Sequence, residues 1–328
     1  MGSINVLITV VLDDECLKQI TGISPKIKLA DVSDLFRAEQ SGDPAAKGKL
    51  DALLAEAEVI YGLRLPKKVI TRAPKLKWVQ VMSAGIERFL DTEMMESRVM
   101  LTNVSGIHAI PISELVLGLM LMFVKQAPLS FQLKQEKQWR RFTPSVLHSK
   151  TVGIVGLGSI GREVARLART FGMRVLAVDV KRMAQARYVD IMLPSDQLWQ
   201  LLAESDFVVL SVPLTAETKN LIGEKELRTM KSTAYLINIA RGGIADEESL
   251  IRALDEHWIA GAGLDVFATE PLPTDSRLWE LPNVILSPHI AGSMEDYIIR
   301  ATGVFTENLR RYVRGKKLLN VVNKKKGY

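Results

Sequence analysis

Short apolar runs alternate with helical stretches along the first part of the chain. Five runs have the length and β-branched content of buried strands, at residues 4–12, 27–32, 59–63, 76–81 and 99–104. Helices are predicted between most of them, at residues 14–20, 47–57 and 87–96. Because repeated strand–helix–strand order produces a parallel sheet with right-handed crossovers, these residues predict a compact α/β domain of flavodoxin-like type.

A helix without a polar face is predicted next. Every residue from 115 to 124 is apolar or glycine, and Pro111 or Ser113 is suited to begin the helix, with Glu114 in its first turn. Since a surface helix shows a polar face, we expect this helix to be buried between domains, in a subunit interface or in the core of the monomer.

Residues 151–179 carry the strongest pattern in the chain. An apolar run at 152–155 is followed by Gly156, Gly158 and Gly161 in G-x-G-x-x-G spacing, then by an amphipathic helix, and then by a second apolar run that ends in Asp179. A dinucleotide-binding βαβ unit requires a strand, glycines, a helix, a strand and an acid in this order. An ordinary βαβ turn is the alternative interpretation.

Each glycine predicts a different contact with a dinucleotide. Gly156 permits the tight turn, Gly158 lets a pyrophosphate approach the backbone, and Gly161 lets the helix pack against the strand. The N–H groups at the start of the helix, around Ser159 and Ile160, are then expected to face the phosphates.

Asp179 bears on the choice of cofactor. Its carboxylate can accept hydrogen bonds from a ribose diol and would repel a 2′-phosphate, so NAD is expected. Lys181 and Arg182 follow it and could bind a 2′-phosphate, which leaves NADP possible.

The rest of the chain continues the alternation. Further strands are predicted at residues 207–212, 234–239, 262–267 and 284–286, with helices at 247–258 and around 303–313. We therefore expect two doubly wound parallel-sheet domains: a Rossmann dinucleotide-binding domain at residues 106–290, inserted into a flavodoxin-like substrate-binding domain at residues 1–105 and 291–328.

Composition narrows the class of protein. The chain has 328 residues, 47% of them hydrophobic and 24% charged, which allows two domains with sizeable cores. Its single cysteine, Cys16, argues against a disulfide framework or a cysteine-based metal site and fits a cytoplasmic protein, and no metal is expected. The first 15 residues predict a strand rather than a signal peptide, and no apolar stretch is long enough to span a bilayer.

The charge is moderately basic, with a formal net value of +6 and a pI of about 9.3. Arg and Lys residues gather at residues 310–317 and 324–326 with few aromatic residues among them. Since nucleic-acid surfaces combine such charge with aromatic side chains, we interpret this region as a solvated helix and tail. No nucleic-acid or membrane partner is expected.

Polar residues with complementary chemistry follow three predicted strands. Arg241 matches a carboxylate and could polarise a carbonyl, His289 is a proton donor near neutral pH, and Glu270 beside it would favour the imidazolium. Hydride transfer to a 2-oxo acid needs these three functions. The alternatives are a helix-capping arginine, a surface glutamate and a histidine satisfied in a turn. His108 could also line a cleft.

Two loops in the first domain also follow strands. One is at residues 62–64, and the other, at residues 82–85, runs into a predicted helix and includes Ser83, Ala84 and Gly85. Such a turn offers backbone N–H groups to an anion such as a carboxylate. A plain βα turn is the alternative.

The chain resembles the D-isomer-specific 2-hydroxyacid dehydrogenases. The similar segments, whose order and spacing are specific to the family, are GLGSIGREVARLARTFGMRVLAVD, SVPLTAETKNLIG, LINIARGGIADEESLIRAL, GAGLDVFATEPLP and PNVILSPHIAG. The resemblance implies an NAD(P)-dependent oxidoreductase that acts on a small 2-oxo or 2-hydroxy acid, similar to glyoxylate/hydroxypyruvate reductases. It also implies a homodimer formed through the nucleotide domain.

The resemblance also implies residue roles. Arg241 would bind the substrate carboxylate and carbonyl, His289 would be the acid/base, and Glu270 would pair with it. The backbone at Ser83, Ala84 and Gly85 would bind the substrate carboxylate. Asp265 would hold the nicotinamide carboxamide and Asp179 the adenosine ribose, and the remaining expected cofactor contacts are Pro213, Ala240 and Gly292.

Proteins that resemble this family also have other activities. A phosphoglycerate dehydrogenase of the long type is not expected, because no regulatory extension follows the second domain, and Glu270 stands where formate dehydrogenases carry Gln. A phosphite dehydrogenase shares the same three residues and stays an alternative. A dinucleotide-sensing corepressor is the alternative from another class, although such proteins usually carry extensions.

Overall fold

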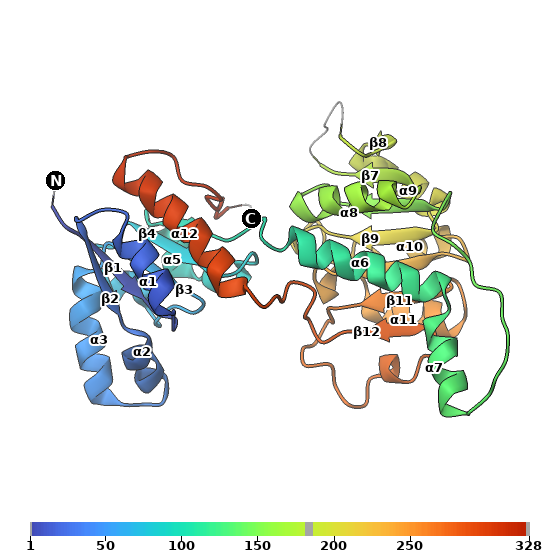
Figure 1. Ribbon diagram of the computed structural model, residues 1–328, viewed down its shortest axis with the longest axis horizontal. Helices are drawn as coiled ribbons and strands as arrows, with labels where there is room; N and C mark the ends of the chain where they lie inside the picture. The colour runs from blue at the N-terminus through green and yellow to red at the C-terminus, as the bar shows by residue number, and fades with distance from the viewer. Residues whose placement is uncertain (1, 181–185, 326–328) are drawn as a thin grey trace. The chain divides into compact units, whose positions relative to one another are not determined.

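The computed structural model describes residues 2–180 and 186–325, without the side chain of Glu87, and the chain divides into two compact units (Figure 1). The first unit comprises Met1–Ile107 and Met294–Tyr328, and the second comprises His108–Ser293. The boundaries expected from the sequence, after residues 105 and 290, lie slightly before these positions.

The first unit is built on a five-stranded parallel sheet. Its strand order is β2-β1-β3-β4-β5, which is the flavodoxin-like order. The strands are β1 (Ile4–Ile8), β2 (Ile27–Asp31), β3 (Val59–Gly62), β4 (Trp78–Val81) and β5 (Met100–Thr102). Each is shorter than its apolar run, which continues into the loop after β1, β2 and β3, begins before β4, and extends on both sides of β5.

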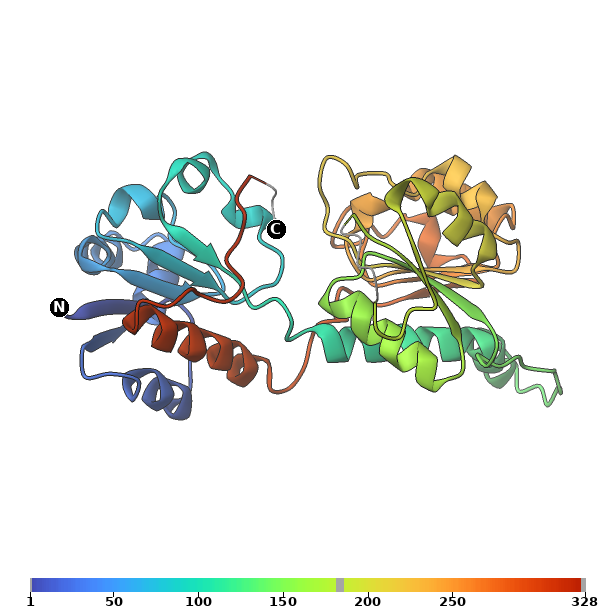
Figure 2. The ribbon, with the colours of Figure 1, turned by 90° about the horizontal axis from the view of Figure 1, so that it is seen from above.

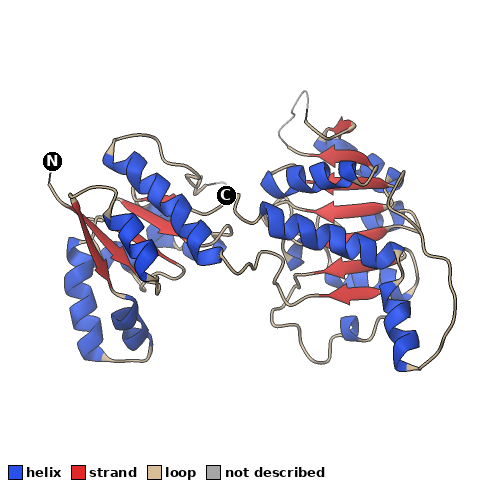
Figure 3. Ribbon diagram, in the orientation of Figure 1, coloured by secondary structure: helices blue, strands red, loops and turns tan. Residues whose placement is uncertain are grey.

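Helices cover both faces of this sheet (Figure 3). They are α1 (Asp14–Thr21), α2 (Ser33–Gln40), α3 (Pro44–Glu56), α4 (Val69–Arg72), α5 (Thr92–Glu96) and α12 (Tyr297–Val313). Successive side chains of β1 point to opposite faces of the sheet. Leu7 packs with α2 and α3, whereas Val6 and Ile8 pack with α1 and α12. The unit therefore has two apolar layers, one on each side of the sheet.

The sequence misplaced one helix and missed two in this unit. The predicted helix at 87–96 is a 3₁₀ helix at Glu87–Phe89 followed by α5, because the Asp91 side chain accepts the Met94 N–H at 2.8 Å and caps a new helix. Helices α2 and α4 were not predicted.

Most residues from 314 to 325 are exposed, as the prediction of a solvated C-terminal tail requires, but the segment is also anchored to the first unit. Val321 forms an antiparallel bridge with Thr102, and Val322 is buried in the core. The Lys324 ammonium group donates to the carbonyl oxygens of Met94 and Ser97 at 2.8 and 3.1 Å. Burial lowers the pKa of Lys324. The segment after α12 therefore completes the first unit.

The second unit contains a seven-stranded parallel sheet in the order β12-β11-β10-β9-β6-β7-β8. Its strands are β6 (Thr151–Val155), β7 (Arg174–Val178), β8 (Ile191–Leu193), β9 (Phe207–Leu210), β10 (Tyr235–Asn238), β11 (Gly261–Leu264) and β12 (Val284–Leu286). The order reverses between β6 and β9, as in a Rossmann sheet with one added edge strand. The predicted fold class is confirmed.

Two helical layers enclose this sheet (Figure 2). The helices are α6 (Ala109–Val124), α7 (Ala127–Gln135), α8 (Ser159–Thr170), α9 (Leu198–Glu204), α10 (Glu224–Thr229) and α11 (Glu247–Asp255). In β9, Phe207 and Val209 pack with α6 and α8, while Val208 and Leu210 pack with α9, α10 and α11. The point of strand-order reversal thus lies within a well-packed layer.

Of the three places left open for the apolar helix, the structure shows the core of the unit. This helix, α6, begins earlier than expected, after His108, and buries Val116 and Met120 completely against α8. No single helix among the described residues is long and apolar enough to cross a membrane. Helices α6 and α7, bent by 62°, meet that test of length and composition only as a pair.

Candidate active site

The predicted chemical residues of the second unit follow three neighbouring strands. Strand β11 pairs with β10 on one side and with β12 on the other, and Asn238, Leu264 and Leu286 lie in one row across them. The loops that begin after this row carry Arg241, Glu270 and His289. Because the strands are parallel, all three loops leave the same edge of the sheet, where ligands of doubly wound folds bind.

The structure brings His289 and Glu270 into direct contact. The distance from His289 Nδ1 to Glu270 Oε2 is 2.7 Å, and Glu270 Oε1 accepts the Phe267 N–H at 3.1 Å. An ionised carboxylate only accepts hydrogen bonds, so Nδ1 carries a proton and Nε2 is the nitrogen that can exchange one. About half of the His289 side chain is exposed (49%), so a small molecule can reach it.

Asp265 holds the loop that carries His289. Its carboxylate, which is 1% exposed, accepts hydrogen bonds from the Ser287 hydroxyl at 2.6 Å and from the Ile290 and Ala291 N–H groups at 2.9 Å. The three donors lie on both sides of His289, whose φ of 54° is left-handed. A buried carboxylate thus fixes a turn that positions the imidazole. The sequence did not predict this contact.

Arg241 lies on a loop that packs against the Glu270 loop. A side chain at Gly242 would collide with the backbone of Phe267, so glycine allows this close approach. Asn238 stabilises the turn by donating to the Arg241 carbonyl at 3.0 Å and accepting the Ala240 N–H at 3.1 Å. Arg241 Nη1 donates to the Ala240 carbonyl at 2.7 Å.

His108, which stands just before α6, belongs to the same part of the second unit. A Cβ atom on Gly292 would come within 2.8 Å of His108 Cδ2, so the ring packs tightly against that glycine. Burial lowers the pKa of His108 below its ordinary value, and the charge of Arg241 lowers it further. The imidazole is therefore neutral at pH 7 and lies within the field of Arg241.

The glycine-rich turn has the space that a dinucleotide requires. Gly156 has a φ of 96°, and a Cβ there would meet Val212 at 2.7 Å. A side chain on Gly161 would collide with the Gly156 carbonyl, whereas Gly158 has no atom within 4 Å of its Cβ position. The N-cap of α8 is Gly158, which has no side chain to cap the helix, and the described residues supply no acceptor for the N–H groups of Ser159 and Ile160.

Asp179 stands at the end of β7 beside this turn. Its Oδ2 accepts the Leu157 N–H at 2.7 Å, which fixes the carboxylate next to the glycines. Pro213 follows β9 at the same edge, and its carbonyl accepts the Thr218 hydroxyl at 2.6 Å. These residues fit a dinucleotide. Lys181 and Arg182 lie outside the described residues.

The predicted loop of the first unit follows β4. Ser83 Oγ donates to the Gly85 carbonyl at 2.7 Å, and Asn103 Nδ2 donates to the Ala84 carbonyl at 2.8 Å. Arg88 Nη2 donates to the Leu63 carbonyl at 2.9 Å and so links the two loops that the sequence singled out. Asn103 was not predicted, although an asparagine within an apolar run was a signal that could have indicated it.

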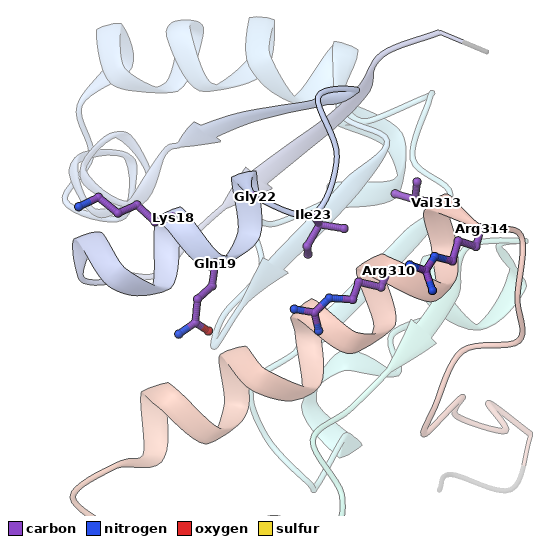
Figure 4. Close-up of a pocket in the computed structure, with 7 residues that line it drawn as sticks. All are labelled: Lys18, Gln19, Gly22, Ile23, Arg310, Val313 and Arg314. Carbon is purple, nitrogen blue, oxygen red and sulfur yellow. The ribbon is translucent and has the colours of Figure 1, made fainter.

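A hollow elsewhere in the first unit does not belong to this site (Figure 4). It has a volume of about 260 Å³ and lies between α1 and the C-terminal part of α12, lined by Lys18, Gln19, Gly22, Ile23, Arg310, Val313 and Arg314. None of the predicted site residues lines it. In the part of the chain that the structure describes, no group of three or more His, Cys, Asp or Glu residues could hold a metal ion.

Comparison with known proteins gives a consistent result. Residues 117–291 match the family model described as D-isomer specific 2-hydroxyacid dehydrogenase, NAD binding domain. A glyoxylate reductase of Korarchaeum cryptofilum is 37% identical over 315 residues, which cover 93% of this chain and 95% of that protein.

Solved structures agree over the whole chain. A D-isomer specific 2-hydroxyacid dehydrogenase of Xanthobacter autotrophicus, in complex with NADPH and MES, aligns with a TM-score of 0.85 at 27% identity, covering 100% of both chains. An NADPH-dependent glyoxylate/hydroxypyruvate reductase of Sinorhizobium meliloti, in complex with NADP and sulfate, aligns with a TM-score of 0.84 at 26% identity, covering 99% of this chain and 100% of that one.

Proposed function

The chain belongs to the D-isomer specific 2-hydroxyacid dehydrogenase family, and from this premise we propose that it reduces a small 2-oxo acid, glyoxylate or hydroxypyruvate, with His289 as the acid. It is an NAD(P)-dependent oxidoreductase. The observation that carries the proposal is the contact of 2.7 Å between His289 Nδ1 and Glu270 Oε2, which leaves Nε2 to deliver a proton.

Glu270 orients the proposed acid. It accepts a hydrogen bond from Nδ1 and so fixes the imidazole tautomer and the direction of the ring. The Phe267 N–H donates to the other carboxylate oxygen of Glu270 and so fixes the orientation of the carboxylate that contacts His289. Arg241 is proposed to bind the carboxylate of the substrate with its planar fork and to polarise the carbonyl that is reduced.

The cofactor contacts are proposed from the fit of the glycine turn. Gly156, Gly158 and the first turn of α8 would hold the pyrophosphate, and Asp179 would accept hydrogen bonds from the adenosine ribose. The bound nicotinamide supplies the hydride. A carboxylate has about four acceptor positions, and Asp265 uses three of them for donors of the loop that carries His289. The remaining one is proposed for the nicotinamide carboxamide, with Pro213, Ala240 and Gly292 lining the same cofactor site.

We propose NADH as the preferred cofactor, because Asp179 places a negative charge at the ribose-binding position. The named structural relatives contain NADPH or NADP, so a direct comparison of the two cofactors decides the point.

We also propose a cytoplasmic homodimer formed through the second unit. Two exposed aromatic residues in and after α7, Phe131 (59% exposed) and Trp139 (95% exposed), support a surface that is covered by a second copy.

Substitution of Arg241 tests the proposed function. Arg241→Ala should lower kcat/KM for glyoxylate and hydroxypyruvate about 10²- to 10³-fold, the cost of losing a charged donor at the reacting carbonyl. NADH binding, followed by the fluorescence of the bound cofactor, should not change. Arg241→Lys keeps the charge without the fork and should retain part of the activity.

Controls separate this result from unrelated losses. Arg228→Ala removes an arginine of α10, which pairs with Glu224 at the surface, and should behave as wild type. The same assays with NADPH, with pyruvate and bulkier 2-oxo acids, and with phosphite and NAD⁺ identify the cofactor and substrate. If Arg241→Ala reduces 2-oxo acids at the wild-type rate, the role given to Arg241 is wrong.

A further inference from the structure

The loop at residues 82–85 has all four of its carbonyl oxygens engaged within the first unit. The donors are, in chain order, the Tyr297 hydroxyl to Met82, the Val104 N–H to Ser83 at 3.3 Å, the Asn103 side chain to Ala84 at 2.8 Å and the Ser83 hydroxyl to Gly85 at 2.7 Å. Because a protein group satisfies each of these carbonyls, the backbone of the loop is held in one orientation.

The N–H groups of the same loop are arranged in the opposite way. Met82 donates its N–H to the Gly62 carbonyl at 2.9 Å. Among the described residues, no acceptor is found for the N–H groups of Ser83, Ala84 and Gly85. These three residues are partly exposed. Three successive N–H groups without an acceptor in the described residues are donors that an anion can use.

Peptide planarity connects the two observations. The carbonyl of one residue and the N–H of the next belong to one planar trans unit and point in opposite directions. The anchors on Met82, Ser83 and Ala84 therefore fix the directions of the N–H groups of Ser83, Ala84 and Gly85, respectively. Two of these anchors are side chains, Tyr297 and Asn103.

Tyr297 is the anchor that comes from the other end of the chain. It is the first residue of α12, 215 positions after Met82, and its ring packs on the apolar cluster that contains the buried Met82 side chain. Burial raises the pKa of Tyr297 above its ordinary value, against a smaller opposing effect of the Arg88 charge. The phenol is thus protonated at neutral pH, and its hydroxyl donates a hydrogen bond to the Met82 carbonyl.

We propose that Tyr297 is a positioning residue for substrate binding: its hydroxyl orients the Met82–Ser83 peptide so that the Ser83 N–H points at the carboxylate of the 2-oxo acid. The inference rests on the proposed function, because it assumes that the carboxylate binds this loop. Tyr297 does not touch the reacting atoms. Its loss should weaken carboxylate binding and leave the chemical step in place.

Tyr297→Phe removes only the hydroxyl and is the sharpest test. The KM for glyoxylate, and the inhibition constant of oxalate as a carboxylate probe, should each rise about fivefold to tenfold, the effect expected for one hydrogen bond. The value of kcat should stay within about twofold, because Arg241 and His289 are unchanged. NADH binding should match that of the wild type, whereas the lost hydrogen bond to the Met82 carbonyl should lower the thermal unfolding temperature.

Tyr312→Phe is the matched control. Tyr312 also lies on α12, and its hydroxyl donates to Glu58 at 2.7 Å instead of to a carbonyl of the loop at residues 82–85. This variant should keep the wild-type KM and oxalate inhibition. If Tyr297→Phe also keeps both values, or if the two variants lose affinity and thermal stability equally, Tyr297 does not position the loop.

The proposed function and this inference fail in different ways. An active wild type whose Tyr297→Phe variant keeps its KM overturns only the positioning role. A wild type that reduces no 2-oxo acid and binds no oxalate in calorimetry, with NADH present, overturns the proposed function and the inference with it.

Discussion

Single side chains determine the protonation states at the edge of the second sheet. Glu270 keeps the proton of His289 on Nδ1, and Asp265 fixes the turn around that histidine through three hydrogen bonds. A second histidine, His108, lies in the same unit against Gly292 and is neutral at pH 7 because burial and the charge of Arg241 lower its pKa. Two imidazoles of one unit thus have different environments.

His108 predicts a loss of stability in mild acid. In the unfolded chain it takes up a proton as the pH falls through its ordinary pKa of 6.5, whereas in the folded chain it stays neutral to a lower pH. The unfolded state therefore gains protons first, and stability decreases from about pH 6.5 down to the lowered folded pKa. Above pH 6.5 this group has no effect.

Thermal unfolding at a series of pH values checks this prediction. As the pH falls from 7.5 into the acid range, the unfolding temperature of His108→Asn should fall less than that of the wild type. At pH values above 7.5 the unfolding temperatures of the two proteins should change in parallel. His257→Asn, at an exposed position after α11, is the control. Identical pH dependence in the wild type and His108→Asn would contradict the lowered pKa.

At the level of residues, the sequence indicated candidate chemical groups but few of the contacts that hold them. The pairing of His289 with Glu270 was implied by the resemblance to the family, and the structure has these two side chains in contact. The contacts of Asp265 with Ser287, Ile290 and Ala291 could not be predicted, because they depend on the path of a turn that has no local pattern. The tight contact of His108 with Gly292 joins residues far apart in the chain.

Among the elements, the turn between β6 and α8 is the clearest case of glycines with separate functions. Gly161 is required by packing, because a side chain there would collide with the Gly156 carbonyl. Gly158 is not required by packing, since its Cβ position has no neighbour within 4 Å and its φ of −70° suits any residue. We attribute the open space beside Gly158 to the proposed dinucleotide.

Alanine at the two positions should therefore have opposite effects. Gly161→Ala should lower stability by about 1–3 kcal/mol, the usual cost of overpacking, and the loss is measured as a lower unfolding temperature. Gly158→Ala should fold as stably as the wild type but bind NADH at least about tenfold more weakly, because its Cβ occupies space needed by the pyrophosphate. Wild-type NADH affinity in Gly158→Ala would refute this placement of the cofactor.

Elements with strong patterns were predicted, and short or interrupted ones were not. Strand β12 has the bounds that its apolar run indicated. The sequence missed the three-residue β8 and five helices, which are α2, α4, α7, α9 and α10. The predicted helix at 87–96 failed because Asp91 forms a cap within it. Periodicity detects long amphipathic segments, but a single capping side chain can divide one.

At the scale of the whole molecule, each unit has its own core of two apolar layers, one on each face of its sheet. The first unit is completed only by the last part of the chain, where Tyr297 reaches Met82 and Val322 donates its N–H to the Leu101 carbonyl at 2.9 Å. The sequence predicted that the C-terminal residues return to the first domain. It could not predict their contacts, because partners more than 200 positions apart share no local signal.

The central claim is that this chain reduces 2-oxo acids with His289 as the acid. Its most direct test is the pH dependence of kcat/KM for glyoxylate and hydroxypyruvate with NADH, in the wild type and in His289→Asn. The wild type should slow as the pH rises through the range in which imidazoles lose their proton, and His289→Asn should be about 10²- to 10⁴-fold slower with a flat profile. A His289→Asn enzyme with the wild-type rate and pH profile would contradict the account.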